Sequence, residues 1–416
     1  MSEETIQKLK NSKYFCLMPW MHFHSWPNGD VFPCCMADPS QKFGNTHKSS
    51  IKEIINSEEF KQLRSNMLSD QPSPACKRCY ELEQSADVYT LRKNSLMSFG
   101  DEHFERAVKS TDAKGELREF KMAYLDIRFS NLCNFKCRTC GPIFSSAWAE
   151  EEDRFSLTGR KTPILSLLDN PNFWTEFEPM LAHVEEVYFA GGESLISPEH
   201  YRILDYWLEQ KMQHVRLRYT TNFSHFKFKS KNLLEYWKEF SNIRVAASLD
   251  ADGSRGEYVR KGTNWDIIVS NRREMIEKCP HVYFEITPTV SAYTCLNLPD
   301  FHRAWIEEGL LEPANIRINY LLDPVEMRAQ ILPQNIKEKI KDRYSEHIAY
   351  LERLEKEKGL NLSQTKHDFN EVVNFVFKQD LTRHLPDFMK QNRRLDERRN
   401  EDFFKIFPEL SELSNF

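Results

Sequence analysis

No apolar run in this 416-residue chain approaches the roughly 20 residues that a helix needs to span a bilayer. The N-terminal run Met1-Ser-Glu-Glu-Thr-Ile-Gln-Lys is charged and lacks the apolar segment of a secretory signal. Neither charge sign dominates, because 57 Lys and Arg residues stand against 62 Asp and Glu residues, which gives a formal net charge of −5. We therefore expect a cytoplasmic protein, and we find no electrostatic argument for a nucleic acid or an anionic membrane as a partner.

The chain contains ten cysteines, and in a reducing compartment clustered cysteines indicate metal ligands before they indicate disulfides. Three of them lie in the run Cys133-Asn-Phe-Lys-Cys137-Arg-Thr-Cys140. Three thiolates in one short loop can bind three irons of a cubic [4Fe–4S] cluster and leave the fourth iron open. An open metal position is typical of a catalytic site rather than of a structural one.

Short apolar runs alternate with longer amphipathic runs between residues 121 and 322. The predicted strands are Ala123–Phe129, Glu186–Ala190, Arg216–Thr221, Arg244–Leu249, Tyr283–Val290 and Ile316–Leu321. The predicted helices between them include Pro198–Met212, Asn232–Phe240, Trp265–Lys278 and Pro299–Glu308. This alternation predicts parallel βαβ units. Six such strands predict an α/β fold with a partial (β/α)6 barrel, whose chemistry lies at the carboxyl ends of the strands.

Four parts are expected along the chain. They are a small cysteine-rich domain (1–85), a helical linker (86–120), the partial barrel (121–325) and a helical C-terminal extension (326–416). The first part contains one clear helix near Ser50–Met67. The extension contains the mixed-charge run 393–399, which predicts a solvated helix face rather than a binding patch.

Polar motifs follow the predicted strands. Gly191-Gly192-Glu193-Ser194 comes after the second strand, where paired glycines allow a ligand to approach and a carboxylate can accept hydrogen bonds from an amine. Such triplets are also common turns. Thr220-Thr221-Asn222 ends the third strand, and it is either a polar cap or a ligand contact.

Two further candidates follow the fourth predicted strand. Ser248 stands at its end, and Arg260 begins the segment Arg260-Lys261-Gly262. A guanidinium suits a carboxylate ligand because its donors match both oxygens. Asp250 and Asp252 lie between them in a turn, which is a common position for aspartate.

The three-cysteine loop together with these strand-end motifs resembles the radical S-adenosylmethionine (radical SAM) superfamily over about residues 121–322. The resemblance implies reductive cleavage of S-adenosylmethionine to a 5′-deoxyadenosyl radical, which abstracts a hydrogen atom from the substrate. It also implies an electron donor such as flavodoxin or ferredoxin. The implied ligands of the catalytic cluster are Cys133, Cys137 and Cys140, and the implied cofactor-binding residues are Gly191, Gly192, Glu193, Ser248 and Arg260. Thr139 and Ser194 depart from the family pattern, which has an aromatic residue and a proline at these places.

The N-terminal cysteines form a second pattern. Cys16, a Gly29-x4-Cys34 segment and a Cys76-x-x-Cys79 pair resemble the twitch domain, the short form of the SPASM domain. The resemblance implies an auxiliary [4Fe–4S] cluster on these four cysteines, with Cys35 as a rival to Cys34. A zinc site with four cysteine ligands and plain buried cysteines are the alternatives.

The remaining cysteines and the reaction are less defined. Cys279 is expected to be structural, and Cys295 is either structural or a substrate-side residue. A fully ligated auxiliary cluster suits electron transfer, so we expect oxidation of a substrate, either a ribosomally made peptide or a carbohydrate-like small molecule. The alternative from another class is a non-enzymatic iron–sulfur or zinc protein. No residue is identified as a catalytic base.

Overall fold

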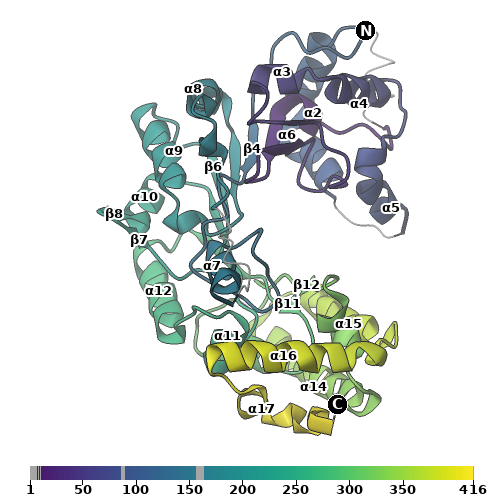
Figure 1. Ribbon diagram of the computed structural model, residues 1–416, viewed down its shortest axis with the longest axis vertical. Helices are drawn as coiled ribbons and strands as arrows, with labels where there is room; N and C mark the ends of the chain where they lie inside the picture. Colours follow the sequence, from purple (N-terminus) through teal and green to yellow (C-terminus); the bar gives the residue numbers. More distant parts are fainter. Residues whose placement is uncertain (1–6, 8, 10, 86–89, 156–163, 416) are drawn as a thin grey trace. The chain divides into compact units, whose positions relative to one another are not determined.

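The computed structural model describes residues 7, 9, 11–85, 90–155 and 164–415 (Figure 1). These residues form two compact units. The first takes those within Met1–Leu132, Thr162–Arg218 and Glu239–Asn242, and the second takes those within Cys133–Lys161, Tyr219–Lys238 and Ile243–Phe416. The predicted boundary between residues 85 and 86 adjoins residues 86–89, which lie outside the described residues. The four domain limits stay a prediction.

The first unit is built on a mixed sheet. Strand β1 (His22–Ser25) pairs in parallel with β4 (Tyr124–Ile127), which pairs in parallel with β5 (Glu186–Phe189). On its other side β1 is antiparallel to β2 (Asp30–Phe32), and β2 is antiparallel to β3 (Gly44–Asn45). The cysteine-rich segment therefore contributes a strand of its own to the parallel sheet.

The helices of the first unit are short near the N-terminus. They are α2 (Met18–Met21), α3 (Ile51–Ile55), α4 (Glu58–Leu68), α5 (Lys77–Ser85), α6 (Leu91–Ser110), α8 (Phe173–Phe177) and α9 (Pro198–Glu209). The predicted helix near Ser50–Met67 is in fact two helices. The reason is that the Ser50 and Ser57 hydroxyls each accept a backbone N–H hydrogen bond, so each residue begins a helix of its own.

The second unit contains further parallel pairs. Strand β9 (Ile243–Ala247) pairs in parallel with β10 (Tyr283–Ile286), and β11 (Thr289–Val290) with β12 (Asn319–Tyr320). Strand β6 (Arg216–Thr221) is divided, with its last three residues in this unit. Strands β7 (Lys227–Phe228) and β8 (Lys231–Asn232) form a small antiparallel hairpin.

The helices of the second unit dominate its C-terminal part (Figure 1). They are α7 (Ser146–Phe155), α10 (Leu233–Glu239, whose last residue belongs to the first unit), α11 (Gly253–Val259), α12 (Trp265–Lys278), α13 (Leu298–Glu307), α14 (Gln334–Lys358), α15 (Ser363–Phe377), α16 (Leu385–Arg399) and α17 (Phe403–Ile406). Gly359 ends α14 in the left-handed conformation, with φ of 65°. None of the helices in the described ranges is long and apolar enough to cross a membrane.

The predicted α/β class with a mostly parallel sheet is confirmed. Strands β4, β5, β6, β9, β10 and β12 lie inside the predicted ranges or within one residue of them. The predicted strand Tyr283–Val290 is divided into β10 and β11. Pro288 lies between the two pieces, and a proline has no backbone N–H to donate to a neighbouring strand.

A buried arginine holds the N-terminal helices together. Arg64, in α4, is fully buried, and its guanidinium donates hydrogen bonds of 2.8–3.2 Å to oxygen atoms. The four acceptor oxygens belong to Pro19, Ile55, Asn56 and Gly115. Because these residues lie in α2, at the end of α3 and in the loop after α6, one side chain fixes three separate segments.

We expect Arg64→Met to destabilise the first unit, because it leaves buried carbonyl oxygens without donors. The cost should be ~3 kcal/mol, which lowers the midpoint of thermal unfolding by several degrees. Differential scanning calorimetry of the full chain measures this, with the exposed Arg78→Met as the matched control. Equal midpoints for the two variants would contradict the role assigned to Arg64.

Candidate functional site

The loop with Cys133, Cys137 and Cys140 belongs to the second unit. The pKa of the Cys137 thiol is raised to about 12, chiefly by burial; Arg260 opposes this shift, and the neighbouring Cys140 and Cys133 contribute to it. Cys133 and Cys140 are therefore close enough to Cys137 to repel its thiolate form. A set of iron ions supplies the positive charge that such a group needs, so the donor set fits a cluster.

The backbone of this loop is fixed by the segment that follows α11. The amide of Lys136 donates to Lys261 O at 2.8 Å, and the amide of Arg138 donates to Val259 O at 2.8 Å. Helix α7 holds the other side of the loop, since the indole of Trp148 donates to Cys137 O at 2.6 Å. The predicted Arg-Lys-Gly motif and the cysteine loop thus lie side by side.

Asn222 also contacts this loop. Its side-chain amide donates to the side-chain oxygen of Asn134 at 2.8 Å. The sequence left open a polar cap or a ligand contact for the Thr-Asn pair; the structure shows a third role, in which Asn222 positions the cysteine loop. Ser248 lies directly after β9, where the sequence predicted it, and its amide donates to Thr221 O at 2.8 Å.

Arg260 lies beside the cysteine loop, and Asp250 orients it. The Arg260 Nε donates to Asp250 Oδ2 at 2.7 Å, and Nη1 lies 3.9 Å from Cys137 Sγ. Asp250 is buried and also accepts the amide of Thr289 at 2.8 Å. The sequence suggested only a turn for Asp250. The role of Asp250 in orienting Arg260 was therefore missed. The only sequence signal for it is a carboxylate ten residues before an arginine, which is weak evidence without the fold.

A second buried arginine connects the cysteine loop with the C-terminal helices. Arg138 donates to Glu401 Oε2 at 2.7 Å and forms a further ion pair with Asp396. Its guanidinium lies over the ring of Tyr258, 3.6 Å from the centroid, and the Tyr258 hydroxyl donates to Asp396 at 2.8 Å. Arg138 is 1% exposed, so these partners compensate the buried charge of a residue that lies between Cys137 and Cys140.

The prediction that run 393–399 forms a solvated helix face is wrong for one side of α16, which is buried. Arg399 is buried and pairs with Glu151 of α7 at 2.7 Å, and Asp396 is one of the partners of Arg138. Arg393 and Arg394 remain exposed. Carboxylates on α7 and cations in the cysteine loop neutralise the inner side of the helix, which a charge count along the sequence does not reveal.

The glycine pair belongs to the first unit. Gly191 and Gly192 have φ of 83° and 52°, and a Cβ on Gly192 would lie 2.4 Å from Leu132 O. The amide of Glu193 donates to the same Leu132 oxygen at 2.8 Å, and Glu193 Oε1 accepts from Leu195 N at 3.1 Å. Glu193 also lines a small cavity together with the first glycine and three serines. The motif is therefore a tight turn whose carboxylate borders a cavity.

The four N-terminal cysteines surround one cavity in the first unit. It is lined by Cys16, Cys34, Cys76 and Cys79 together with apolar and aromatic residues. Burial raises the pKa of Cys16 to about 11 and that of Cys76 to about 12, and neighbouring thiols raise both. Four converging thiols fit a metal centre with no open position.

Cys35 faces elsewhere. Burial and the carboxylate of Asp126 raise the pKa of its thiol well above the ordinary value, and Cys35 is not among the described residues that line the four-cysteine cavity. This arrangement favours Cys34 over Cys35 as the fourth ligand.

Arg92 is a residue of this site that no sequence motif marked. It lines the cavity, lies close enough to Cys16, Cys76 and Cys79 to lower the pKa of each, and pairs with Glu83. Its Nη1 also donates to a backbone carbonyl oxygen, that of the residue before Cys16, at 3.1 Å. A buried cation beside converging thiols favours their thiolate forms.

The last two cysteines are buried away from both groups. Cys279 donates to Leu234 O at 3.4 Å, which is consistent with the structural role expected for it. Cys295 is 0% exposed, and burial raises the pKa of its thiol to about 12. Of the two readings of Cys295, its complete burial favours the structural one.

We expect Gly262→Ala to loosen the cysteine loop. Gly262 has φ of 114°, and an added Cβ would lie 2.8 Å from Asn134 O, so the loop or the segment must move. Strain of about 1–3 kcal/mol corresponds to roughly 5–150-fold faster amide exchange at Lys136 and Arg138. Hydrogen-exchange mass spectrometry of the full chain measures it. Gly141→Ala is the control in the same loop, because its Cβ meets nothing within 4 Å; equal exchange in both variants would refute the prediction.

Comparison with known proteins adds one family match. Residues 16–80 match the model of the SPASM family, an iron–sulfur cluster-binding domain. No curated protein matches the chain. The match covers the segment that contains all four cysteines of the cavity.

Several solved structures are similar to part of this chain. The structure of polyhistidine-tagged anSMEcpe with bound AdoMet is 18% identical, with coverage of 50% of this chain and 51% of its own and a TM-score of 0.35. Streptococcus suis SuiB bound to S-adenosylmethionine is 17% identical, with coverage of 64% and 52% and a TM-score of 0.34. TYW1 with a lysine-pyruvate adduct is 16% identical, with coverage of 53% and 71% and a TM-score of 0.27. The chain spans about half the length of the first two, and such TM-scores do not establish a shared overall fold. The N-terminal segment 16–80, with four cysteines around one cavity, is similar to SPASM iron–sulfur cluster-binding domains.

Proposed function

We propose that the chain is a radical SAM enzyme with two [4Fe–4S] clusters. The catalytic cluster is bound by the loop of Cys133, Cys137 and Cys140, and the auxiliary cluster by Cys16, Cys34, Cys76 and Cys79. The observation that carries the proposal is the contrast between the two cysteine groups. One is a loop of three neighbouring thiols, and the other is a cavity enclosed by four, within a segment similar to SPASM domains.

The residues of the second unit have distinct tasks in this proposal. When bound, the catalytic cluster supplies the electron that cleaves S-adenosylmethionine to a 5′-deoxyadenosyl radical. Three thiolates leave one iron open for the cofactor. Arg260 places positive charge 3.9 Å from Cys137 Sγ, and Asp250 fixes its guanidinium at 2.7 Å. Ser248 binds the cofactor from the end of β9.

The glycine turn of the first unit binds the amino group of the cofactor. Gly192 allows the backbone to pass close to Leu132, and the buried Glu193 carries the acceptor oxygens. A carboxylate suits a protonated amine because charge-assisted hydrogen bonds are about twice as strong as neutral ones. The strands that carry these motifs belong to a partial (β/α)6 barrel in this proposal.

The auxiliary cluster sets the reaction type. Four cysteine ligands leave no open iron, so its use is electron transfer rather than substrate binding. We infer an oxidative modification of a peptide or a small molecule, with electrons supplied to the catalytic cluster by a flavodoxin or a ferredoxin. Zn²⁺ also takes four thiolate ligands, which makes a non-enzymatic metal protein the second candidate.

We expect about eight irons per chain in the anaerobically reconstituted protein and about four in a Cys133/Cys137/Cys140→Ala variant. 5′-Deoxyadenosine should form from S-adenosylmethionine under strong reduction in the wild type only. Iron assay and liquid chromatography measure both quantities. About four irons in the wild type with none in the variant would leave zinc or nothing at the N-terminal cysteines. A full iron count without 5′-deoxyadenosine, with or without added peptide substrates, would favour the non-enzymatic candidate.

The adjacent cysteines of the first unit give a matched pair for the auxiliary site. Cys34→Ser should lower the iron count from about eight to about four, whereas Cys35→Ser should leave it unchanged. The reason is that only Cys34 lines the cavity with the other three cysteines. The reverse result would make Cys35 the ligand.

A further inference from the structure

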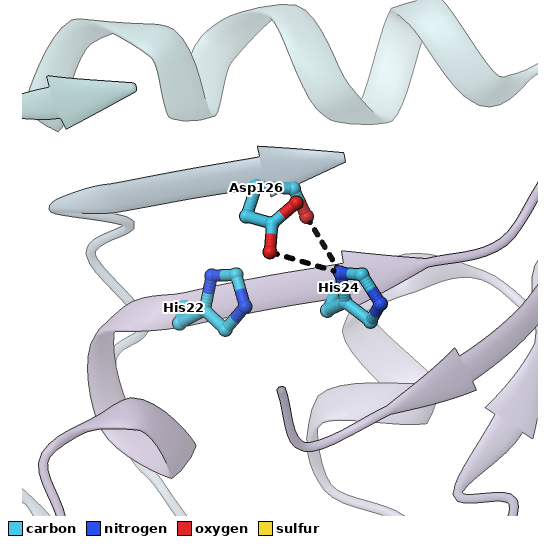
Figure 2. A group of neighbouring side chains, drawn as sticks. All are labelled: His22, His24 and Asp126. Carbon is cyan, nitrogen blue, oxygen red and sulfur yellow. Dashed lines mark hydrogen bonds and ion pairs between the residues drawn. The ribbon is translucent and has the colours of Figure 1, made fainter. Parts of the chain in front are cut away.

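Two histidines and an aspartate converge on one face of the first unit's sheet (Figure 2). His22 and His24 come from β1, and Asp126 comes from the parallel neighbour β4. The register places His22 opposite Tyr124, so His24 is level with Asp126. One possible ligand atom from each of the three side chains lies within 4.8 Å of the others. All three residues are buried, with exposures of 2%, 0% and 0%.

Backbone hydrogen bonds fix the protonation of both imidazoles. His22 Nδ1 lies 3.0 Å from Tyr124 O, and His24 Nδ1 lies 2.9 Å from Asp126 O. A carbonyl oxygen only accepts, so each Nδ1 carries a hydrogen and donates it. In the neutral rings each Nε2 then carries a lone pair. A histidine whose second ring nitrogen donates to a backbone carbonyl is common among metal ligands.

The other polar atoms of this three-residue cluster have few hydrogen-bond partners. Among the described residues, neither His22 Nε2 nor His24 Nε2 has a hydrogen-bond partner. The partners of the Asp126 carboxylate are His24, whose Nδ1 lies 3.5 Å from Oδ2, and the thiol of Cys35. Figure 2 shows the carboxylate lying over the space between the two rings. Buried polar atoms without partners are costly, which indicates a missing group.

A proton alone does not complete this cluster. A doubly protonated His24 would pair with Asp126, but it would add a buried Nε2–H with no acceptor, and it would leave His22 Nε2 unchanged. Arg128 and the thiol of Cys35 also lie near Asp126. Burial lowers the pKa of His22 to about 4, so that ring is neutral at pH 7. His22 Nε2 and the Asp126 carboxylate can bind a cation directly, and the His24 nitrogen on their side is Nδ1, which a cation would bind in place of its hydrogen.

We propose that His22, His24 and Asp126 bind a divalent transition-metal ion of the zinc type, which ties β1 to β4. Two imidazoles and a carboxylate are ordinary ligands of Zn²⁺. Bonds of about 2.0–2.1 Å place tetrahedral ligand atoms roughly 3.4 Å apart, so the cluster closes around an ion by a small contraction. Three protein ligands leave the fourth position of a tetrahedral ion to a further small ligand. The site shares no ligand with either cysteine group.

Metal analysis of the full chain with reconstituted clusters tests the proposal. We expect about one zinc per chain in the wild type after expression with added zinc, and loss of most of it in His22→Ala and in Asp126→Asn. His47→Ala is the matched control, because His47 is an exposed histidine of the same unit. No zinc in the wild type, or unchanged zinc in both variants, would overturn the proposal.

X-ray absorption at the zinc edge of the wild type keeps the test decisive if the variants fail to fold. We expect a nearest shell dominated by nitrogen and oxygen at about 2.0–2.1 Å with scattering from imidazole rings. A shell made only of sulfur at about 2.3 Å would place the zinc in the cysteine sites and overturn the assignment. Neither measurement depends on the activity of the chain.

Discussion

Sulfur atoms buried close together are the constraint on which both cysteine sites depend. A thiolate in a dry environment is costly and neighbouring thiolates repel one another, so burial first and nearby thiols second raise the pKa of Cys16, Cys76 and Cys137. Each site carries an arginine as partial compensation, the buried Arg92 in the N-terminal site and the half-buried Arg260 beside the loop. One such cation cannot balance three or four thiolates, so the sites are suited to a multinuclear metal centre. The identity of the bound metal then decides the chemistry, because zinc has no redox chemistry and an iron–sulfur cluster can transfer electrons.

The sequence predicted what depends on short spacing. The Cys-x3-Cys-x2-Cys loop, the glycine turn at Gly191 and the strands that precede the polar motifs all lie within stretches of a few residues, where backbone and ligand geometry are local. The α/β class followed from the alternation of such stretches. These features need no knowledge of distant partners.

What the sequence did not predict depends on contacts between distant segments. Strand β1 has no long apolar run, and it becomes a strand because β4, about one hundred residues later, pairs with it. Asp250 was interpreted as a turn residue because its ion pair with Arg260 becomes visible only in the folded chain. The inner side of α16 was assigned to solvent because the charges that neutralise it lie on α7 and in the cysteine loop. The choice between Cys34 and Cys35 likewise depended on which side of the chain each thiol faces.

The ion pair between Arg138 and Asp396 has a consequence for the order of assembly. The two residues are 258 positions apart, so the cysteine loop lacks this anchor until the later segment has been synthesised. At ordinary translation speeds of about 5–20 residues per second, this delay is roughly 13–50 s. During that interval every residue that lines the four-cysteine cavity has already been synthesised, because all of them lie between positions 14 and 92. The four-cysteine cavity of a nascent chain can therefore form well before its three-cysteine loop takes its final form.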